Sequence, residues 1–548
     1  MRPRRTSAAL GVRWSAAKLA NPRTAAFRGV SPYSLTGPYG IGCAQRDVCY
    51  DLRVARNRRA VRADPTHIGV IRMPEGSFAA LDYMFHPRSV AVVGASTHDG
   101  PGSFVSAIKE MGFTGDLYPV NPKATEIAGL TCYPGLREIP GHVDHVISSV
   151  PLRFVEQLVE DAGAKRVKVI HFFTAGFSET GDEEAAALEQ RVLARAKDLG
   201  MRVIGPNCMG LYVPAAGLSF MPGMPAEPGP VAMLSQSGAN AGEFCRTGAV
   251  RGLRYSKVVS YGNGTDVRES ELLEYCGEDP ETSVIACYIE GLRDGAHFLR
   301  ALKKAAAAKP VVILKGGRTE EGSRAANSHT GSLAGSLEIF DAAVRQAGAV
   351  RVDRMEELVD QTVAFRYLPA LRGPNAGIVG GGGGYSVLAS DEVGAAGLGM
   401  PALPEDVQQR LRDFTPTAGT SVRNPVDTSV GWGPEGLKPM LDTIRIVSEA
   451  PNIDFVLYHT SYSWGAMRAE GPSIVEVAAE AAHGLGAIAR ETGKPIVCVA
   501  RMPTTELGMA GTLSFQQNVA NEGLACFNSV RDAALAIRRL LKWQASRG

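Results

Sequence analysis

This sequence has little net charge and no evident framework for metal or disulfide chemistry. Its 58 basic and 56 acidic residues leave a net charge of +2 over 548 residues, which predicts no general attraction to nucleic acid or to an acidic membrane surface. The nine cysteines lack CxxC pairs and histidines at ligand spacing. The cysteine pattern therefore predicts no metal site and no disulfide framework, and it indicates a cytoplasmic protein.

Uninterrupted apolar segments of membrane-spanning length are also lacking. Two long uncharged stretches occur, but residues 203–226 contain four prolines and residues 373–390 are packed with glycine. Neither predicts a spanning helix, since such a helix must satisfy its own backbone groups. No membrane segment and no secretory signal are expected, and the length indicates three or four domains.

The N-terminal segment differs from the rest of the chain in its charge. Residues 1–62 contain twelve arginines and one lysine but only two acidic residues, Asp47 and Asp51, and they show no apolar periodicity. We interpret residues 1–79 as a disordered or misannotated extension, with Met73 or Met84 as an alternative start. The Arg-rich, acid-poor composition also resembles a transit peptide, and this alternative stays open.

From about residue 86, short apolar runs alternate with glycine turns and helical stretches. This alternation predicts an α/β fold with parallel sheets and right-handed crossovers. Proline- and glycine-rich breaks divide the pattern into three domains, residues 80–212, 213–372 and 373–548. The predicted strands are residues 89–94, 117–120, 145–150, 167–173, 202–204, 230–234, 255–259, 283–289, 310–314, 376–379, 454–458 and 495–499.

Turns that follow three strands of the first domain form a candidate phosphate-binding crevice. Backbone N–H groups in such turns approach a phosphate, and a lysine adds a point charge. No acidic residue follows the second strand, which disfavours a dinucleotide with a free ribose diol. Ordinary turn chemistry is the alternative interpretation. The candidate residues are Gly94, Ser96, Asn121, Pro122, Lys123, Val150 and Pro151.

A second candidate anion site follows the first strand of the second domain. Ser235, Gln236, Ser237 and Gly238 lie between an apolar strand and a helix. Hydroxyls, a glycine and free N–H groups at a helix N-terminus form a nest for phosphate. The nearby turn at residues 205–210 is either a structural turn or a ligand contact.

His329 is the candidate catalytic residue. It lies in Ser328-His-Thr-Gly-Ser332, a segment of small and polar residues in which a packed core histidine is not expected. A neutral imidazole is a competent nucleophile toward phosphoryl groups. Glu290, at the end of an apolar strand, could accept the second N–H of that ring. A surface histidine without function is the alternative.

Taken together, these motifs resemble the NDP-forming acyl-CoA ligases of the succinyl-CoA synthetase superfamily. The resemblance is closest to the α part of ADP-forming acetate–CoA ligases and covers residues 84–540. The residues that carry it are 89–96, 118–123, 205–210, 235–239, 260–263, 315–318, 328–332 and 424–427.

The resemblance implies a Rossmann-like CoA-binding domain followed by two flavodoxin-like parallel-sheet domains. In this view His329 becomes phosphohistidine, Glu290 supports it, the turn at Ser235 holds phosphate, and Gly94, Ser96 and Lys123 line the CoA site. The implied substrates are a small carboxylic acid or its acyl-CoA, CoA and phosphate. The glycine run at residues 380–384 receives no ligand assignment.

The family also requires an ATP-grasp domain, and no such pattern occurs in this sequence. We therefore expect ATP or ADP and Mg²⁺ to bind an ATP-grasp β subunit, so that the chain works in a hetero-oligomer, with a homodimer as the form adopted alone. Two alternatives remain: a non-catalytic CoA-binding regulatory protein, and an acyl- or carbamoyl-transferring relative that works without phosphohistidine.

Overall fold

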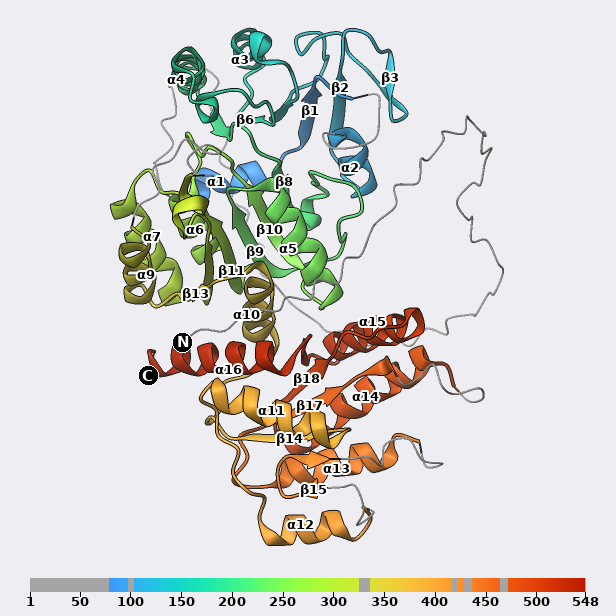
Figure 1. Cartoon of the computed structure of the whole chain (residues 1–548). Coiled ribbons are helices and arrows are strands. Elements are labelled where there is room, and N and C mark those ends of the chain that lie inside the picture. The colour runs from blue at the N-terminus through green and yellow to red at the C-terminus, as the bar shows by residue number, and fades with distance from the viewer. Residues whose placement is uncertain are drawn as a thin grey trace, which may run out of the picture. The chain divides into compact units, whose positions relative to one another are not determined.

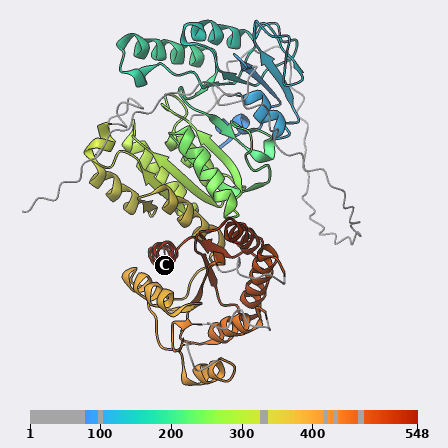
Figure 2. The ribbon, with the colours of Figure 1, turned by 45° about the vertical axis from the view of Figure 1, so that its right-hand side comes forward.

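The computed structural model describes residues 78–96, 103–324, 336–415, 421–427, 436–463 and 472–547, with side chains from residue 81 onward. Three sheets of five, six and six strands organise these residues, together with a two-stranded hairpin. Helices cover both faces of the sheets (Figures 1 and 2). The central strands are therefore buried on both faces, and they consist of continuous apolar runs rather than alternating patterns.

The first sheet has the order β2-β1-β5-β6-β7, and all its pairs are parallel. The order reverses at β1, so the carboxyl ends of β1 and β5 flank a topological switch point, where ligands of such sheets bind. The strands are β1 (Ser89–Val93), β2 (Asp116–Val120), β5 (His145–Ser148), β6 (Val169–Phe172) and β7 (Arg202–Ile204), and the hairpin is β3 (Glu126–Ile127) with β4 (Leu130–Thr131).

Helices pack on both faces of this first sheet. On one face lie α1 and α2, and on the other lie α3 and α4. Helix α4 begins at the Asp182 cap, whose carboxylate accepts the Ala185 N–H. The helices are α1 (Phe78–Phe85), α2 (Phe104–Glu110), α3 (Val155–Ala164) and α4 (Glu183–Asp198), with 3₁₀ turns at Leu152–Phe154, Ser178–Thr180 and Pro214–Ala216.

The second sheet has the order β13-β12-β11-β9-β10-β8. Only β8 is antiparallel, and the order reverses at β9, which places a switch point between β9 and β11. The strands are β8 (Gly210–Tyr212), β9 (Pro228–Ser235), β10 (Tyr255–Ser260), β11 (Val284–Ile289), β12 (Val311–Lys315) and β13 (Val350–Val352). The helices are α5 (Gly238–Val250), α6 (Glu269–Glu278), α7 (Gly295–Ala308), α9 (Leu337–Gln346) and α10 (Met355–Tyr367).

The third sheet has the order β15-β16-β14-β17-β18-β19, with β15 antiparallel to β16. Its switch point lies between β14 and β17. The strands are β14 (Ala376–Gly380), β15 (Ser421–Val422), β16 (Val426–Asp427), β17 (Phe455–Thr460), β18 (Ile496–Ala500) and β19 (Ala525–Phe527). The helices are α11 (Gly383–Ala395), α12 (Glu405–Arg412), α13 (Lys438–Glu449), α14 (Ile474–Thr492), α15 (Glu506–Asn521) and α16 (Val530–Ala545).

The second and third sheets share a hydrophobic core in which α16 packs against α10. A buried ion pair lies beside this contact: the guanidinium of Arg251 is 2.7 Å from the carboxylate of Asp360 and also donates to the carbonyl of Cys526 in β19. Arg539 of α16 is paired with Glu357 of α10 at 2.7 Å. These contacts join the two sheets through charged groups as well as apolar ones.

The predicted α/β fold with parallel sheets is confirmed, and each predicted strand is present within a few residues. The strands that were missed have only two or three residues each, and runs this short seldom show a readable apolar pattern; they are β3, β4, β8, β13, β15, β16 and β19. Strand β8 pairs with β10, so residues 210–212, predicted to end the first domain, belong to the second sheet. The three domain ranges otherwise remain predictions. In the described part of the chain, no helix is long and apolar enough to cross a membrane.

Candidate functional site

Gly94 marks the point where β1 meets its neighbours at the carboxyl edge of the first sheet. Its N–H donates to the carbonyl of Val120 at 2.9 Å, and the Ser149 N–H donates to the carbonyl of Val93 at 2.8 Å. Gly94 has φ of +82°, and a Cβ there would lie 2.7 Å from the Ser149 carbonyl oxygen. Glycine is therefore required, because the ends of β1 and β5 approach too closely for any side chain.

Asn121 connects the turns that follow β1 and β2. Its side-chain amide donates to the carbonyl of Ala95 at 2.9 Å, and its amide oxygen accepts the Lys123 N–H at 2.9 Å. Pro122 lies between them, and Ser96 is exposed next to Ala95. Among the described residues, no carboxylate pairs with the Lys123 ammonium, so its charge is available to an anion.

Val150 and Pro151 follow β5 on the other side of the switch point. The Thr174 hydroxyl donates to the Val150 carbonyl at 2.8 Å and lies 3.1 Å from the Ser148 hydroxyl. These bonds fix the turn in place. All seven candidate residues of the first domain thus follow β1, β2 or β5 at one edge of the sheet; their role in binding CoA remains a prediction.

The turn after β9 is held by its own side chains. The Ser235 hydroxyl donates to the Ser237 carbonyl at 2.6 Å and accepts the Ser237 N–H at 3.1 Å. Ser237 is the N-cap of α5, and its hydroxyl accepts the Asn240 N–H at 3.3 Å. Gly238 begins the helix. The remaining N–H groups and the helix dipole at this terminus favour an anion.

Gln236 joins this turn to Glu290. The side-chain oxygen of Gln236 accepts the backbone N–H groups of Glu290 and Gly291, the latter at 2.9 Å. The backbone N–H of Gln236 donates to the carbonyl of Tyr288. The predicted phosphate turn and the predicted carboxylate therefore lie side by side across the β9–β11 switch point. The sequence alone could not predict this contact, because the two residues are 54 positions apart in the chain.

Glu290 is 6% exposed and has further polar neighbours. The Tyr288 hydroxyl is hydrogen-bonded to its carboxylate, and burial, followed by that charge, raises the pKa of Tyr288. The Lys315 ammonium donates to the backbone carbonyls of Glu290 and Gly316. Burial lowers the pKa of Lys315 despite the nearby carboxylate. Lys315, not among the predicted site residues, therefore lies against the Glu290 backbone at this edge.

The turn at residues 205–210 packs over the same helix terminus. Met209 donates its N–H to the Ser260 hydroxyl at 3.1 Å, and a Cβ on Gly238 would lie 2.2 Å from the Met209 side chain. The Asn263 N–H donates to the Pro206 carbonyl at 3.0 Å. These contacts support the structural interpretation of this turn. His329 lies outside the described residues, and its role stays a prediction.

The carboxyl edge of the third sheet brings together polar groups that no sequence motif linked. His459, the penultimate residue of β17, is paired with Gly380 of β14, and a Cβ on Gly380 would lie 2.2 Å from the His459 ring. His459 is 1% exposed, neither ring nitrogen has a hydrogen-bond partner among the described residues, and burial lowers its pKa to about 4. Asp427 accepts the Gly382 N–H at 2.9 Å.

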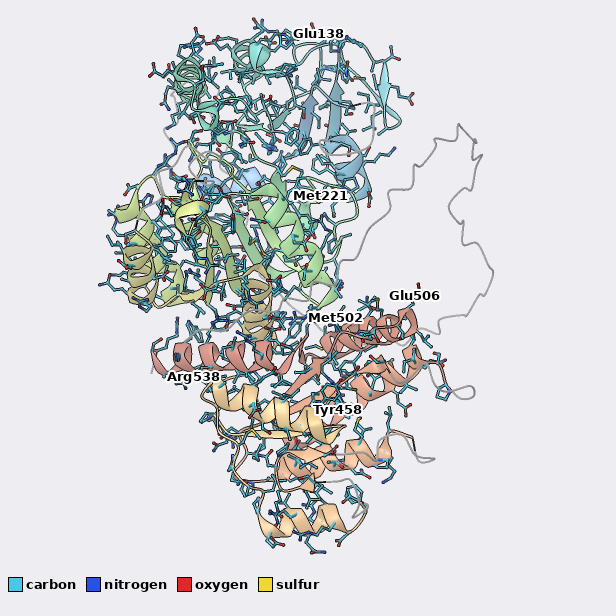
Figure 3. The ribbon with its side chains drawn as sticks, in the orientation of Figure 1. Glu138, Met221, Tyr458, Met502, Glu506 and Arg538 are labelled. Carbon is cyan, nitrogen blue, oxygen red and sulfur yellow. The ribbon has the colours of Figure 1, made fainter. Side chains whose placement is uncertain are left out.

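Arg501 and Met502 follow β18 at that third-sheet edge. The guanidinium of Arg501 lies 3.6 Å from the centre of the Tyr385 ring. Met502 is 64% exposed, and Figure 3 shows it at the surface beside α15. The glycine run at residues 380–384 was the signal in the sequence, but nothing linked it to residues 459 and 501. Among the described residues, no cluster of three histidine, cysteine or acidic side chains could hold a metal.

Three family descriptions match successive parts of the chain. "CoA binding domain" matches residues 88–214, "Succinyl-CoA ligase like flavodoxin domain" matches residues 228–365, and "Ligase-CoA domain" matches residues 376–535. The first and third matches each contain one sheet with its switch point, and the second contains all of the second sheet except β8. The order of the matches is the order that the sequence motifs implied.

Individual proteins show the same similarity. The α subunit of an ADP-forming acetate–CoA ligase II from Pyrococcus furiosus is 38% identical over 69% of this chain and 81% of that subunit. An ADP-forming acetate–CoA ligase I from Archaeoglobus fulgidus is also 38% identical, but the match covers 54% of its length, so this chain spans about half of that relative.

A solved structure extends this similarity to three dimensions. It is described as "dinucleotide forming Acetyl-coenzyme A synthetase 1", in its apo form, from Candidatus Korarchaeum cryptofilum. The two chains are 31% identical with a TM-score of 0.70, over 85% of this chain and 98% of that one. The similarity therefore includes most of the described fold and is not confined to one domain.

Proposed function

Because this chain belongs to the family of ADP-forming acyl-CoA ligases, we propose that it is the CoA-binding, phosphohistidine-carrying component of an acid–CoA ligase. In one direction a phosphate oxygen attacks the carbonyl carbon of an acyl-CoA, and the CoA thiolate leaves. The His329 imidazole then attacks the phosphorus of the acyl phosphate, and the carboxylate leaves. Phosphohistidine finally transfers its phosphoryl group to ADP. The reverse direction makes acyl-CoA.

The observation that carries this proposal is the contact of Gln236 with Glu290. In this contact the N-terminus of α5, our candidate anion site, lies next to a buried carboxylate. The first supplies N–H groups for the phosphoryl oxygens, and the second supplies an acceptor for the N–H of an imidazole. An acceptor there would fix the ring tautomer, leaving the other nitrogen free to attack phosphorus.

The first-sheet edge has donors suited to CoA. Lys123 offers a cation without a carboxylate partner among the described residues, and the turns at Gly94 and Val150 leave backbone groups at the switch point. Phosphate groups and a lysine on a flexible stem are a common pairing. We assign Gly94, Ser96, Asn121, Pro122, Lys123, Val150 and Pro151 to this site.

An ATP-grasp subunit is part of the proposal. Phosphoryl transfer to ADP needs a cradle for the nucleotide and carboxylates for Mg²⁺, and the Pyrococcus furiosus relative is named as an α subunit. We propose a hetero-oligomer in which that second subunit binds ATP or ADP and Mg²⁺. The acid that is activated stays open.

Reconstitution tests the proposal directly. The 548-residue chain should bind CoA in isothermal titration calorimetry, and it should form acyl-CoA from an acid, CoA and ATP only after an ATP-grasp subunit is added. Its phosphorylated form should be acid-labile and base-stable. Acyl-CoA formation by the chain alone would contradict the proposed division of labour. Acyl transfer by the pair without ATP, ADP or phosphate would contradict the phosphohistidine.

A further inference from the structure

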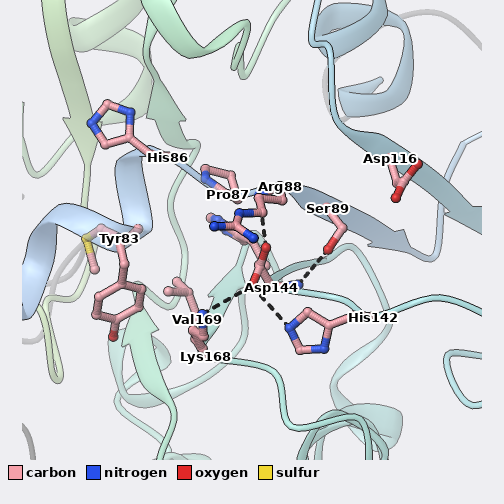
Figure 4. Close-up of a pocket in the computed structure, with 12 residues that line it drawn as sticks. Tyr83, His86, Pro87, Arg88, Ser89, Asp116, His142, Asp144, Lys168 and Val169 are labelled. Carbon is pink, nitrogen blue, oxygen red and sulfur yellow. Dashed lines mark hydrogen bonds and ion pairs between the residues drawn. The ribbon is translucent and has the colours of Figure 1, made fainter. Parts of the chain in front are cut away.

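A pocket lies at the opposite edge of the first sheet, where the strands begin. It has a volume of about 560 Å³ and is formed by the amino ends of β1, β2, β5 and β6 together with helix α1 (Figure 4). This volume is in the range of small-molecule sites. The proposed CoA site lies at the carboxyl ends of the same strands, so the two sites are separate.

The less exposed of the two carboxylates in this pocket is already neutralised. Asp144 accepts the Arg88 backbone N–H at 2.9 Å, and its other oxygen lies 3.1 Å from the His142 ring and 3.4 Å from the Lys168 ammonium. Burial alone would raise the pKa of Asp144, but the Arg88 N–H and the Lys168 charge outweigh it and lower that pKa. Asp144 therefore remains ionised and leaves little negative charge for a ligand to meet.

The second carboxylate is directed elsewhere. Asp116 is hydrogen-bonded to the Tyr118 hydroxyl, and Figure 4 shows its side chain well apart from that of Arg88. Among the described residues, the Arg88 guanidinium has neither an ion pair nor a hydrogen bond. The cation that borders the cavity thus has no anion supplied by this part of the chain.

His145, another residue that lines the pocket, also has unsatisfied polar groups. It is 3% exposed, and neither ring nitrogen has a hydrogen-bond partner among the described residues. Burial, followed by the charge of His171, lowers its pKa to about 3, so the ring is neutral near pH 7. Buried polar atoms in native proteins normally have partners, and an exception points to a water or a ligand.

Of the remaining lining residues, His86 and Ser89 are polar, and the others form an apolar part. Tyr83 and Met84 of α1 form one wall, and Pro87 and Val169 lie between that wall and the polar groups. A free oxyanion would leave this surface uncovered. An anion with an apolar body would contact both parts, with its charge on the Arg88 guanidinium.

We propose that this pocket binds a small organic acid, whose carboxylate is held by Arg88 and whose apolar part packs against Tyr83 and Met84. Helix α1 is tied to the second domain, because Asp82 accepts the Tyr275 hydroxyl at 2.8 Å and Phe85 stacks on Tyr275. A ligand here would therefore contact both the first sheet and a helix that is anchored on the second.

Benzoate is a suitable probe, and the histidine rings report its position. The full chain, labelled with ¹⁵N at its ten histidines, is titrated with benzoate, and the ring resonances are assigned with single His→Gln variants. We expect the His142 and His145 resonances to shift with one dissociation constant and the His459 resonances to stay in place. Shifts at His459 alone, or no shift at all, would overturn the proposal.

Variants of Arg88 separate the proposed contact from a general charge effect. Arg88→Gln should weaken benzoate binding about tenfold or more, and Arg88→Lys should weaken it less, since a point charge replaces a planar fork. Arg191→Gln removes an exposed arginine on α4, paired with Glu156, and should leave binding unchanged. Equal binding by wild type and Arg88→Gln would overturn the assignment of the carboxylate.

Sulfate tests the organic part of the ligand. It should bind more weakly than benzoate, because it cannot cover the apolar wall. Equal or tighter sulfate binding would overturn the organic-acid assignment in favour of a free oxyanion site. These measurements require neither CoA nor turnover, so failure of the proposed ligase activity would not affect their outcome.

Discussion

In the second sheet the turn after β9 leads into α5, and in the third sheet the turn after β14 leads into α11. Both turns lie at the switch point of a parallel sheet and place a helix N-terminus there. At the second-sheet edge, Ser235, Gln236 and Lys315 all have hydrogen-bond partners within the chain. At the third-sheet edge, both ring nitrogens of His459 and the Nε of Arg501 lack partners among the described residues.

The difference indicates two kinds of site on one architecture. The second-sheet edge is preorganised, with side chains fixed before any ligand binds, as phosphoryl transfer requires. The third-sheet edge has glycines where the second has serines, and its buried polar groups need an outside partner. We therefore expect chemistry to depend on the former and docking or ligand contacts to depend on the latter.

The largest effect should come from the candidate nucleophile. His329→Ala should reduce acid-labile ³²P labelling, measured with an ATP-grasp subunit, ATP and Mg²⁺, to background, because no other imidazole is assigned to receive the phosphoryl group. CoA binding should persist. His459→Ala is the matched control at the third-sheet edge and should keep its label. If His329→Ala kept the label and His459→Ala lost it, the chemistry would belong to the third-sheet edge instead of the second.

Glu290→Gln should lower the rate of labelling by about 10- to 100-fold, the usual cost of removing a carboxylate that orients an imidazole. The amide keeps the shape of the side chain but not its charge. The rate is measured by quenched-flow with the same subunit. Glu281→Gln removes an exposed carboxylate of the same domain and should not change the rate. Equal rates for wild type and Glu290→Gln would show that the Gln236 contact is only structural.

A buried charge pair of the second domain, whose arginine also donates to the Cys526 carbonyl of the third sheet, should be costly to lose. Arg251 and Asp360 are 4% and 5% exposed, so Arg251→Ala should lower the free energy of unfolding by about 3–5 kcal/mol through an uncompensated buried carboxylate. Chemical denaturation measures this change. Arg195→Ala breaks an exposed pair with Glu160 and should cost much less, because water screens exposed ion pairs. Equal losses would mean that the buried pair has no special role in joining the two sheets.

His459, whose ring has no hydrogen-bond partner within the described ranges, should make stability depend on pH. Burial lowers its pKa to about 4 in the folded chain, against about 6.5 when unfolded. Below pH 6.5 the unfolded chain binds the extra proton, so stability is lost as the pH falls toward 4. Between pH 7 and pH 5 the loss should be about 2 kcal/mol for this residue.

The variant His459→Asn isolates that contribution. It should decrease the change in unfolding free energy between pH 7 and pH 5 by about 2 kcal/mol, measured by urea denaturation at each pH. His145 and His171, with pKa values lowered by burial to about 3 and about 4, should keep part of the pH dependence. An unchanged dependence in the variant would show that His459 is charged in the folded chain or has a partner.

The smallest effect is expected from the N-terminal segment. Deletion of residues 1–72 should shift the melting temperature by less than about 1 °C and leave CoA affinity unchanged, since the segment has no periodic apolar face to bury. Differential scanning calorimetry and calorimetric titration measure both. A shift of several degrees would show that the segment stabilises one of the sheets.

Sequence patterns alone determined the fold class and the residues grouped at the carboxyl edges of the first and second sheets. Short apolar runs predicted the strands, and the turn residues Gly94, Asn121 and Ser235 lie at or directly after the ends of those strands. Because the carboxyl ends of parallel strands share one edge, local sequence was enough to group them. The same patterns identified Glu290, which ends a strand, and His329, which stays a prediction outside the described residues.

Only the tertiary structure decided which distant groups meet. Gln236 reaches Glu290, and His459 lies against Gly380, because neighbours in a sheet are set by strand order, which short apolar runs do not encode. The pocket at Arg88 follows for the same reason: it needs the amino ends of four strands and a helix anchored on another domain. Local sequence specifies turns and periodicity, whereas contacts across many residues depend on packing of the whole chain.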